Sequence, residues 1–256
     1  MLATRVMPCL LLRNSSLVKT VRFRDPSYVG DPLNAIRIYN EKEVDELVFL
    51  DITATVEQKP PSFRIIAEVA TECFMPVAYG GGIRSLADIE RIFELGIEKV
   101  ALNTAAIELP DLVTEAARQF GSQSIVVSID ALRRRFGGYD TYTRGGRTKA
   151  GTDPVAAARR AETLGAGEIL LTAMHRDGTM EGYDLELIRR VAEAVDVPVI
   201  ACGGAGRVEH FREAVENGAS AVAAGAMVVY HGPHRAVLIN FPSRDELERA
   251  LGGMTR

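Results

Sequence analysis

Short apolar runs rich in β-branched residues recur along the chain and alternate with segments of helical spacing. Leu86, Ile89 and Ile92, for example, fall on one face of a helix. The runs are typical of strands buried on both faces of a parallel sheet. There are eight of them, at 5–12, 46–52, 76–79, 99–102, 124–130, 168–173, 198–201 and 221–224. Because eight strand–helix units close into a barrel, we predict an α/β fold of the (β/α)8 TIM-barrel type, with a doubly wound open sheet as the alternative.

The sequence also repeats itself at a step of about half its length. The heptapeptide PVAYGGG beginning at Pro76 returns as PVIACGG at Pro198, a step of 198 − 76 = 122 residues, and the same step carries Gly96 onto Gly218. A period this long indicates a duplicated half-domain rather than a solenoid, and an open sheet does not predict it. We therefore predict one barrel domain, 1–256, made of two half-barrels, about 1–122 and 123–256.

Two connections are longer than the others, 13–32 after the first strand and 131–154 after the fifth. In a barrel both lie on the catalytic face, because the loops that follow strands line the active site. Loops of this length usually carry function or mobility. Within the second connection, residues 139–143 and the glycine turn at 144–147 predict a small hairpin.

Composition and charge restrict the class of protein. Hydrophobic residues make up 47% of the chain and charged residues 25%, which is typical of a globular protein with a large core. The net charge of −4 gives no reason to expect a nucleic-acid partner. No run approaches the roughly 20 apolar residues that span a bilayer, and no signal peptide is recognisable, so we expect a cytoplasmic protein without a membrane partner. The 3 cysteines are far apart and the 4 histidines form no ligand motif, so we expect free buried thiols and neither a metal nor a cofactor.

Both glycine motifs stand where a strand ends and a helix begins. That geometry presents backbone N–H groups to an anion, and glycine lets a phosphate approach closely. A tight turn would explain one such motif equally well, but the duplication favours two phosphate-binding corners. Such corners suit a bisphosphate or a nucleotide diphosphate sugar. The first corner comprises Gly81, Gly82, Asn103 and Thr104, and the second comprises Gly203, Gly204, Gly225 and Ala226.

Several ionisable side chains are predicted at the same mouth of the barrel. Asp130 ends the fifth strand behind an apolar run, so we expect burial to raise its pKa and Asp130 to act as a general acid/base. Asp51 has two equally good interpretations, a catalytic group or a cap for the following turn. Asp177 precedes glycine, and Asp-Gly is a common turn signal, so a catalytic role has the weaker support. Lys19 could close over an anion from the first long loop, and His175 could donate to phosphate or substrate.

A second charged pattern lies at the opposite ends of the strands. Arg5, Glu46, Lys99 and Glu168 each stand at the start of a strand, and their signs alternate. In a barrel they would form one layer at the floor, where two cations and two carboxylates neutralise each other. The layer is interpreted either as structural closure of the floor or as a gate.

Together these motifs resemble the cyclase subunit of imidazole glycerol phosphate synthase, a (β/α)8 barrel built from two half-barrels. The matching segments are Met1-Leu2-Ala3 with Arg5, 48–54, 79–84, 103–106, 165–172, 176–179 and 203–206. The resemblance implies that Thr172 and Gly178 join the phosphate sites. It also implies that the floor residues Arg5, Glu46, Lys99 and Glu168 surround an entrance for ammonia. A class I glutaminase subunit would dock there and supply the ammonia.

The chain departs from that family at the mouth. The family pattern has an aspartate pair, one ending the first strand and one ending the fifth; here the second is Asp130, but Leu11 holds the first position. Losing one member of an acid/base pair costs on the order of 10² to 10⁴ in rate. His175 replaces a family aspartate, and Ala226 replaces a serine. These changes resemble a paralogous group that serves surface-polysaccharide (lipopolysaccharide) synthesis, in which a glutaminase and a separate sugar amidotransferase help convert an N-acetyl sugar into an acetamidino sugar.

Three hypotheses follow. The leading one is an ammonia-accepting, cyclase-like synthase subunit of a glutamine amidotransferase that serves amidation of a nucleotide sugar or another phosphorylated substrate. The second is a true cyclase subunit of histidine biosynthesis that tolerates Leu11. The third is a non-catalytic ammonia conduit between a glutaminase and another enzyme.

Overall fold

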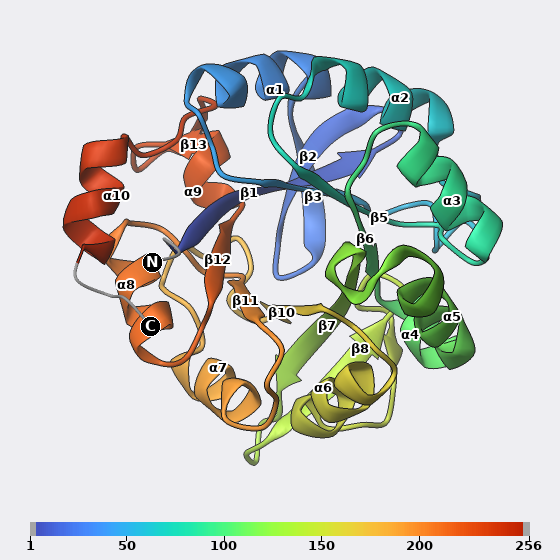
Figure 1. The fold of residues 1–256 in the computed structure, drawn as a ribbon. Coiled ribbons are helices and arrows are strands. Elements are labelled where there is room, and N and C mark those ends of the chain that lie inside the picture. Colours follow the sequence, from blue (N-terminus) through green and yellow to red (C-terminus); the bar gives the residue numbers. More distant parts are fainter. Residues whose placement is uncertain (1–3, 253–256) are drawn as a thin grey trace.

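Eight parallel strands form a closed barrel in the computed structural model, which describes residues 4–252 (Figure 1). The Met1-Leu2-Ala3 match lies outside the described residues. Pairing of β1 with β12 and of β7 with β10 closes the ring, so the open sheet is excluded and the barrel is confirmed. Each of the eight apolar runs corresponds to one barrel strand. The strands are β1 (Arg5–Arg13), β4 (Leu47–Asp51), β5 (Val77–Gly80), β6 (Lys99–Leu102), β7 (Ile125–Arg133), β10 (Glu168–Ala173), β11 (Val199–Cys202) and β12 (Ala221–Ala224).

Helices surround the barrel and cover its outer face (Figure 1). They are α1 (Pro32–Glu41), α2 (Phe63–Glu72), α3 (Leu86–Glu94), α4 (Thr104–Glu108), α5 (Pro110–Phe120), α6 (Pro154–Thr163), α7 (Leu185–Ala192), α8 (Glu209–Glu216), α9 (Ala226–Val229) and α10 (Arg244–Leu251), with a 3-10 turn at Ser122–Ser124. In α3 the Ser85 side chain accepts the Asp88 N–H while the Asp88 carboxylate accepts the Ser85 N–H, a capping box that fixes where the helix begins. The same helix buries Ile89 and Ile92 against the strands. Between residues 4 and 252 the structure contains no helix that is both long and apolar enough to cross a membrane.

The two long connections both fold into antiparallel hairpins that extend the sheet beyond the barrel. The second contains β8 (Tyr139–Thr143) and β9 (Thr148–Lys149), which confirms the hairpin expected there. The first contains β2 (Ser16–Val21) and β3 (Arg24–Gly30), which the sequence analysis did not predict. Its turn lies at Arg22 and Phe23, with φ of 53° and 63°, so no glycine marks it. A short third hairpin, β13 (Tyr230–His231) and β14 (Ala236–Val237), follows α9.

The structure repeats at the same step as the sequence. Strands β5 and β11, strands β6 and β12, and helices α1 and α6 begin 122 residues apart (199 − 77, 221 − 99 and 154 − 32). Asp31 and Asp153 cap the two helices in the same way, each just before a proline. This correspondence supports the division into two half-barrels that we propose.

The apolar side chains of the strands separate into two layers. One set faces outward and packs against the helices. The other fills the inside of the barrel and consists of Met7, Cys9, Val48, Ala78, Ala101, Val126, Leu170, Ile200, Cys202, Ala221 and Ala223, with Leu50 packed against it. Because both faces of each strand are buried, the strands read as continuous apolar runs rather than as alternating ones.

Candidate functional site

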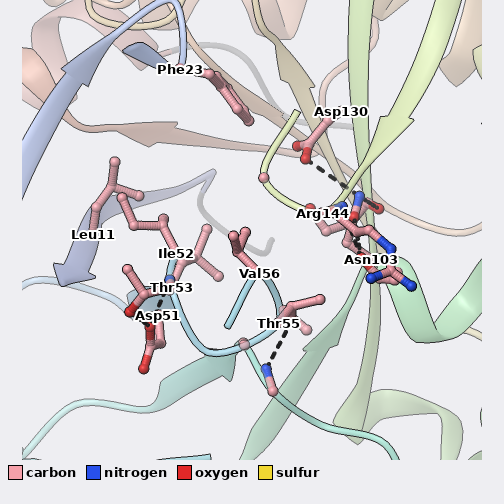
Figure 2. A pocket seen from close by; sticks show the side chains of 18 of the residues that line it. Leu11, Phe23, Asp51, Ile52, Thr53, Thr55, Val56, Asn103, Asp130 and Arg144 are labelled. Atoms are coloured by element: carbon pink, nitrogen blue, oxygen red, sulfur yellow. Dashed lines mark hydrogen bonds between the residues drawn. The ribbon is translucent and has the colours of Figure 1, made fainter. Parts of the chain in front are cut away.

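A cavity of about 440 Å³ opens at the carboxyl ends of the barrel strands (Figure 2). This volume is typical of sites that take a small molecule. Leu11, Leu50, Ile52 and Val56 give it an apolar wall. The predicted site residues that line it are Lys19, Asp51, Gly81, Gly82, Asn103, Thr104, Asp130, Thr172, Asp177 and Gly225. Five other predicted site residues, Gly178, Gly203, Gly204, Ala226 and His175, are not among the lining residues.

Asp130 is buried in β7, three residues before the strand ends, and has 8% of its surface exposed. Burial raises the pKa of its carboxyl group to about 7, and the negative charge of Asp177 contributes to the rise. This agrees with the direction expected from the apolar run before it. A carboxyl group with a pKa near neutrality can both accept and return a proton, which is the property of a general acid/base.

Asn103 holds the surroundings of Asp130 together rather than pointing its amide at an anion. Its Nδ2 donates to the backbone oxygens of Ser128 (3.0 Å) and Tyr142 (3.2 Å), and lies 3.4 Å from Asp130 Oδ2. The hydroxyl of Thr104 in turn accepts the Arg144 N–H at 3.0 Å. At the first corner, therefore, these two side chains connect β7 and the β8–β9 turn to the cavity wall.

Lys19 belongs to strand β2 and is buried, instead of lying in a loop as expected. Its Nζ is 2.7 Å from Asp177 Oδ1, and the Thr20 hydroxyl donates to Asp177 Oδ2 at 3.2 Å. Burial alone would lower the pKa of Lys19, but the Asp177 carboxylate outweighs it and the pKa is raised. Lys19 therefore stays cationic and is paired with Asp177 at the mouth.

Asp51 serves as the cap of the turn that follows β4. Its Oδ1 accepts hydrogen bonds from the Thr53 N–H (2.9 Å), the Thr53 hydroxyl (2.8 Å) and the Ala54 N–H (3.0 Å). This is the second of the two interpretations made from the sequence.

Leu11 lines the side of the cavity that faces Asp130 (Figure 2). An apolar side chain therefore occupies the position opposite the buried carboxyl group.

The glycines of the first corner are required by backbone geometry. Gly81 and Gly82 have φ of +120° and +76°, and a Cβ at Gly82 would lie 2.8 Å from the Lys59 carbonyl oxygen. The Gly82 N–H donates to the Thr55 hydroxyl at 3.1 Å. Thr55 was not identified from the sequence, although it follows β4 closely and the loops after strands line barrel sites.

His175 is directed away from the cavity, contrary to the substrate-binding role expected for it. Its Nε2 lies 3.0 Å from Asp184 Oδ2, a carboxylate that also caps α7 and accepts a hydrogen bond from the Tyr139 hydroxyl at 3.0 Å. Burial opposes ionisation of Asp184, but the close approach of His175 and the hydrogen bonds from the Leu187 N–H and Tyr139 together lower its pKa. The buried Asp184 thus orients His175 toward the start of α7.

Basic residues around the cavity were missed by the sequence analysis. They are Arg13, Lys59, Arg84, Arg144 and Arg147. A signal was present, because Arg84 directly follows the glycine motif and Arg144 and Arg147 flank the predicted turn. Surface arginines are common, however, and only the fold shows that these five converge on one cavity.

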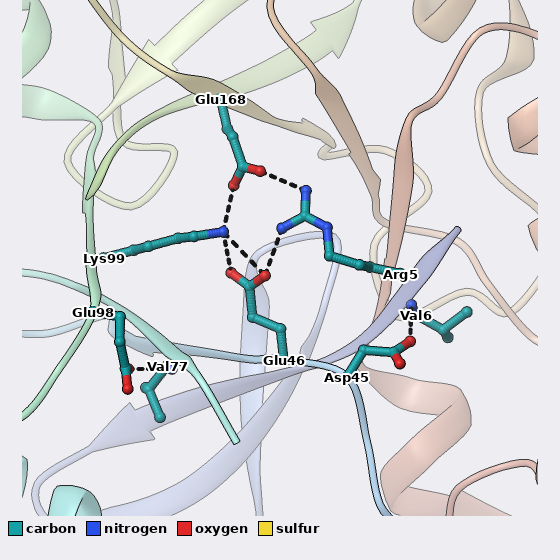
Figure 3. Close-up of polar contacts among 8 residues, drawn as sticks. All are labelled: Arg5, Val6, Asp45, Glu46, Val77, Glu98, Lys99 and Glu168. Carbon is teal, nitrogen blue, oxygen red and sulfur yellow. Dashed lines mark hydrogen bonds and ion pairs between the residues drawn. The ribbon is translucent and has the colours of Figure 1, made fainter. Parts of the chain in front are cut away.

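The four charged residues of the floor form a closed ring (Figure 3). Lys99 Nζ lies 2.9 Å from Glu46 Oε1 and 2.9 Å from Glu168 Oε2. Arg5 binds the same two carboxylates through its two terminal nitrogens. Each cation therefore bridges both carboxylates, and the ring spans the amino-terminal ends of β1, β6 and β10. The arrangement neutralises the charges and closes the floor of the barrel.

Two thiols lie inside the barrel, and that of Cys9 is not activated. Cys9 and Cys202 are both free and buried, and both line the inner end of the cavity. The neighbouring Cys202 thiol and burial together raise the pKa of Cys9 well above its ordinary value. A thiol that stays protonated is a poor nucleophile, which agrees with the expectation for Cys9. Cys73 differs from the expectation of buried thiols, because it is only partly buried.

Comparison with known proteins gives consistent matches over almost the whole chain. The family model described as histidine biosynthesis protein matches residues 5–234. A Pseudomonas aeruginosa protein provisionally named imidazole glycerol phosphate synthase subunit hisF2 is 50% identical over 249 residues, which cover 97% of this chain and 99% of that protein. The provisionally named subunit hisF3 of Vibrio vulnificus is 45% identical over 253 residues, 98% of this chain and 97% of its own length. The imidazole glycerol phosphate synthase subunit HisF of Alkaliphilus metalliredigens is 45% identical over 232 residues, 90% of this chain and 92% of its own length.

Proposed function

The chain belongs to the histidine biosynthesis protein family, among its HisF-like members, and we propose that it is the ammonia-accepting synthase subunit of a glutamine-dependent amidotransferase. The names of the relatives support this proposal, because each denotes a subunit of imidazole glycerol phosphate synthase. The partner we propose is a class I glutaminase subunit that docks on the floor of the barrel and releases ammonia there.

The observation that carries the proposal is the pairing of a charged floor with a reactive mouth. The ring of Arg5, Glu46, Lys99 and Glu168 closes one end of the barrel, and Asp130 lies at the other end. Between them the interior is lined by apolar side chains. An apolar passage favours neutral ammonia over ammonium, because an unpaired ion loses its hydration there. Ammonia that passes the ring would therefore reach Asp130 in its nucleophilic form.

Asp130 is the group that we propose handles protons at the mouth. When ammonia attacks an electrophilic carbon, the nitrogen becomes cationic and must lose a proton. The ionised form of Asp130 can accept that proton, and its pKa of about 7 lets it return the proton to a leaving oxygen. Leu11 cannot take part in proton transfer. Asp130 alone would therefore accept and return the protons that two aspartates handle in the family pattern.

The substrate we propose is a phosphorylated sugar derivative or nucleotide sugar in surface-polysaccharide synthesis. The floor ring is retained while the acid/base pair is broken, a combination expected of a subunit that delivers ammonia to altered chemistry. A sugar amidotransferase would then be a second partner at the mouth. The alternatives remain a true histidine-pathway cyclase and a non-catalytic conduit.

Supplying purified protein with the histidine-pathway substrate and an ammonium salt tests the substrate. We expect formation of imidazole glycerol phosphate to be slower than in a two-aspartate cyclase by about 10² to 10⁴. A rate equal to that of such a cyclase would contradict the sugar proposal and support a role in the histidine pathway.

The variant Asp130→Asn in the assembled amidating system tests whether the barrel catalyses a step or only conducts ammonia. Unchanged amidation by this variant would favour the conduit.

A further inference from the structure

We propose that His210 is a positioning residue of the second glycine corner, where its neutral imidazole keeps the segment 203–206 in the conformation that binds a phosphate group. The proposal rests on the proposed function, because it concerns how the phosphorylated substrate is held at the mouth of the barrel. It assigns a role to a histidine that was not among the predicted site residues.

His210 is buried in the first turn of α8 and contacts the segment 203–206 through one ring nitrogen. Its Nδ1 accepts the Gly206 N–H at 3.1 Å. A Cβ at Gly182 would lie 3.5 Å from Nε2, so the other edge of the ring packs against the loop after β10. Because a backbone N–H can only donate, Nδ1 must be unprotonated in this contact. His210 is therefore neutral here, and its ring hydrogen is on Nε2.

The segment 203–206 lies directly against the loop after β10. A Cβ at Gly204 would be 2.1 Å from the Gly182 carbonyl oxygen, and a Cβ at Gly206 would be 2.2 Å from the Met180 carbonyl oxygen. The Gly182 N–H donates to the Gly204 carbonyl oxygen at 2.8 Å. Because backbone packs on backbone at both glycines, a displacement of Gly206 also displaces Gly204.

Gly204 stands next to the part of the second corner that faces the cavity. Gly225 is partly exposed and lines the cavity, as does Cys202 at the end of β11. Cys202 is the register partner of Ala223, so Gly204 and Gly225 each lie two residues beyond this pair, at the ends of adjacent strands. The backbone that His210 holds is thus continuous with a wall of the cavity.

The first half-barrel makes the same contact with a different side chain. There the Arg84 N–H donates to Asp88 Oδ2 at 2.9 Å. The step of 122 residues carries Arg84 onto Gly206 and Asp88 onto His210 (206 − 84 and 210 − 88). The fold therefore needs an acceptor at this position but not an imidazole. Histidine makes the acceptor of the second corner, and not that of the first, sensitive to protonation near neutral pH.

The surroundings of His210 keep it neutral. Burial lowers its pKa most strongly, and Arg207 before α8 and Arg176 after β10 lower the pKa further. Glu213 and Glu209 of α8 act in the opposite direction but do not reverse the shift. Protonation would place a hydrogen on Nδ1 facing the Gly206 N–H, which would leave that buried donor without an acceptor.

Nuclear magnetic resonance of the protein labelled with nitrogen-15 glycine tests the proposal, with inorganic phosphate as the probe. At pH 8 we expect phosphate to shift the amide signals of Gly204 and Gly225 at the second corner and those of Gly81 and Gly82 at the first. Phosphate affinity can then be read separately from the signals of each corner.

The variant His210→Ala removes the acceptor of the Gly206 N–H. Phosphate affinity read from the second-corner signals should fall about tenfold, whereas the first-corner signals should report a change below about twofold. His210→Asn supplies Oδ1 as a neutral acceptor in place of Nδ1 and should restore the affinity. Asp88→Ala, the matched variant of the first half-barrel, should weaken phosphate binding at the first corner instead.

A pH series separates this role from simple packing. As the pH falls from 8 to 5, wild type should lose phosphate affinity at the second corner, whereas His210→Asn should lose much less because asparagine does not titrate. Comparison of the two proteins at each pH cancels the titration of phosphate and of Asp130, which both samples contain. His234→Asn replaces an exposed histidine and should follow wild type.

Three results would each overturn the proposal: second-corner signals that phosphate does not shift at pH 8, a His210→Asn variant that binds no better than His210→Ala, or equal pH dependence of wild type and His210→Asn. The first and third do not require His210→Ala to fold. Glutamine-driven ammonia transfer by wild type with the glutaminase is measured separately. A chain that transfers ammonia but gives one of these results refutes the role of His210 alone, whereas absence of ammonia transfer would refute the proposed function.

Discussion

Asp130 combines burial with a like charge nearby, and both disfavour its ionised form. The carboxyl group is buried at the mouth, and its pKa rises to about 7, from burial first and from the negative charge of Asp177 second. Asp177 itself is paired with Lys19, whose Nζ lies 2.7 Å from its Oδ1. Of the two carboxyl groups, Asp177 therefore has a buried cationic partner, whereas no cation is among the causes that set the pKa of Asp130.

The raised pKa predicts how stability depends on pH at this residue. In the unfolded chain Asp130 ionises near 3.9, whereas in the folded protein it holds its proton up to about 7. Its contribution to the free energy of unfolding is therefore fully present below about pH 4 and is lost as the pH rises through 7. Asn cannot ionise, so Asp130→Asn does not suffer this loss. The free energy of unfolding of the variant, taken relative to wild type, should therefore be about 3 kcal/mol higher at pH 8 than at pH 5.

Urea unfolding of both proteins at the two pH values measures this difference. Asp111→Asn, which changes an exposed carboxyl group in the first turn of α5, corrects for the general effect of removing a charge. A constant difference between the Asp130 variant and wild type would show that the carboxyl group ionises in the fold as it does in the unfolded chain.

At the scale of elements, the two mouth hairpins show what the sequence can and cannot predict. The β8–β9 hairpin was predicted because Gly145 and Gly146 mark its turn. The β2–β3 hairpin was missed because its turn places Arg22 and Phe23 at positive φ without glycine. Tertiary contacts of β2, above all the Lys19–Asp177 pair, hold that turn, and contacts between residues 158 positions apart leave no local pattern.

The same distinction explains the rest of the site. The strands and the residues of the floor ring share a local pattern, in which a charged residue stands at the start of an apolar run. Because the pattern is local, the barrel and the ring residues could be predicted from the sequence. The orientation of His175 could not, because it depends on Asp184, which also caps α7 and binds Tyr139.

Removing the lysine of the β2 contact should release that hairpin. Lys19→Met leaves the Asp177 carboxylate buried without its partner, which costs about 3–5 kcal/mol when a buried pair is broken. We expect the amide hydrogens of β2 and β3 to exchange faster with solvent while the barrel strands stay protected. Hydrogen exchange followed by mass spectrometry resolves the hairpin from the barrel.

Lys149→Met is the matched control on the other hairpin. Lys149 Nζ lies 2.8 Å from Asp140 Oδ2, but its side chain is 54% exposed, so the loss should be below about 1 kcal/mol. Equal effects of the two variants would mean that the Lys19–Asp177 pair contributes nothing beyond an ordinary surface contact.

At the scale of the whole molecule, the two functional features lie at opposite ends of one apolar interior. The floor ring includes Arg5 at the start of β1, and the cavity begins near Cys9 on the same strand. Met7 and Ala223 are register partners between these two levels, and both belong to the interior cluster. Small side chains on β12 therefore set the width of the barrel interior where ammonia would pass.

A larger side chain at one of these positions should obstruct the passage of ammonia without changing the floor ring or the mouth. Ala223→Val adds two methyl groups inside the barrel, and overpacking of this kind costs about 1–3 kcal/mol. We expect ammonia transfer driven by glutamine to fall severalfold, whereas turnover with an ammonium salt supplied at the mouth should stay near wild type. Ala201→Val, on the outward face of β11, imposes a similar packing cost and should leave the ratio of the two rates unchanged. If both variants lower the two rates in parallel, ammonia does not travel through the interior, and the ring of Arg5, Glu46, Lys99 and Glu168 closes the floor as a structural element alone.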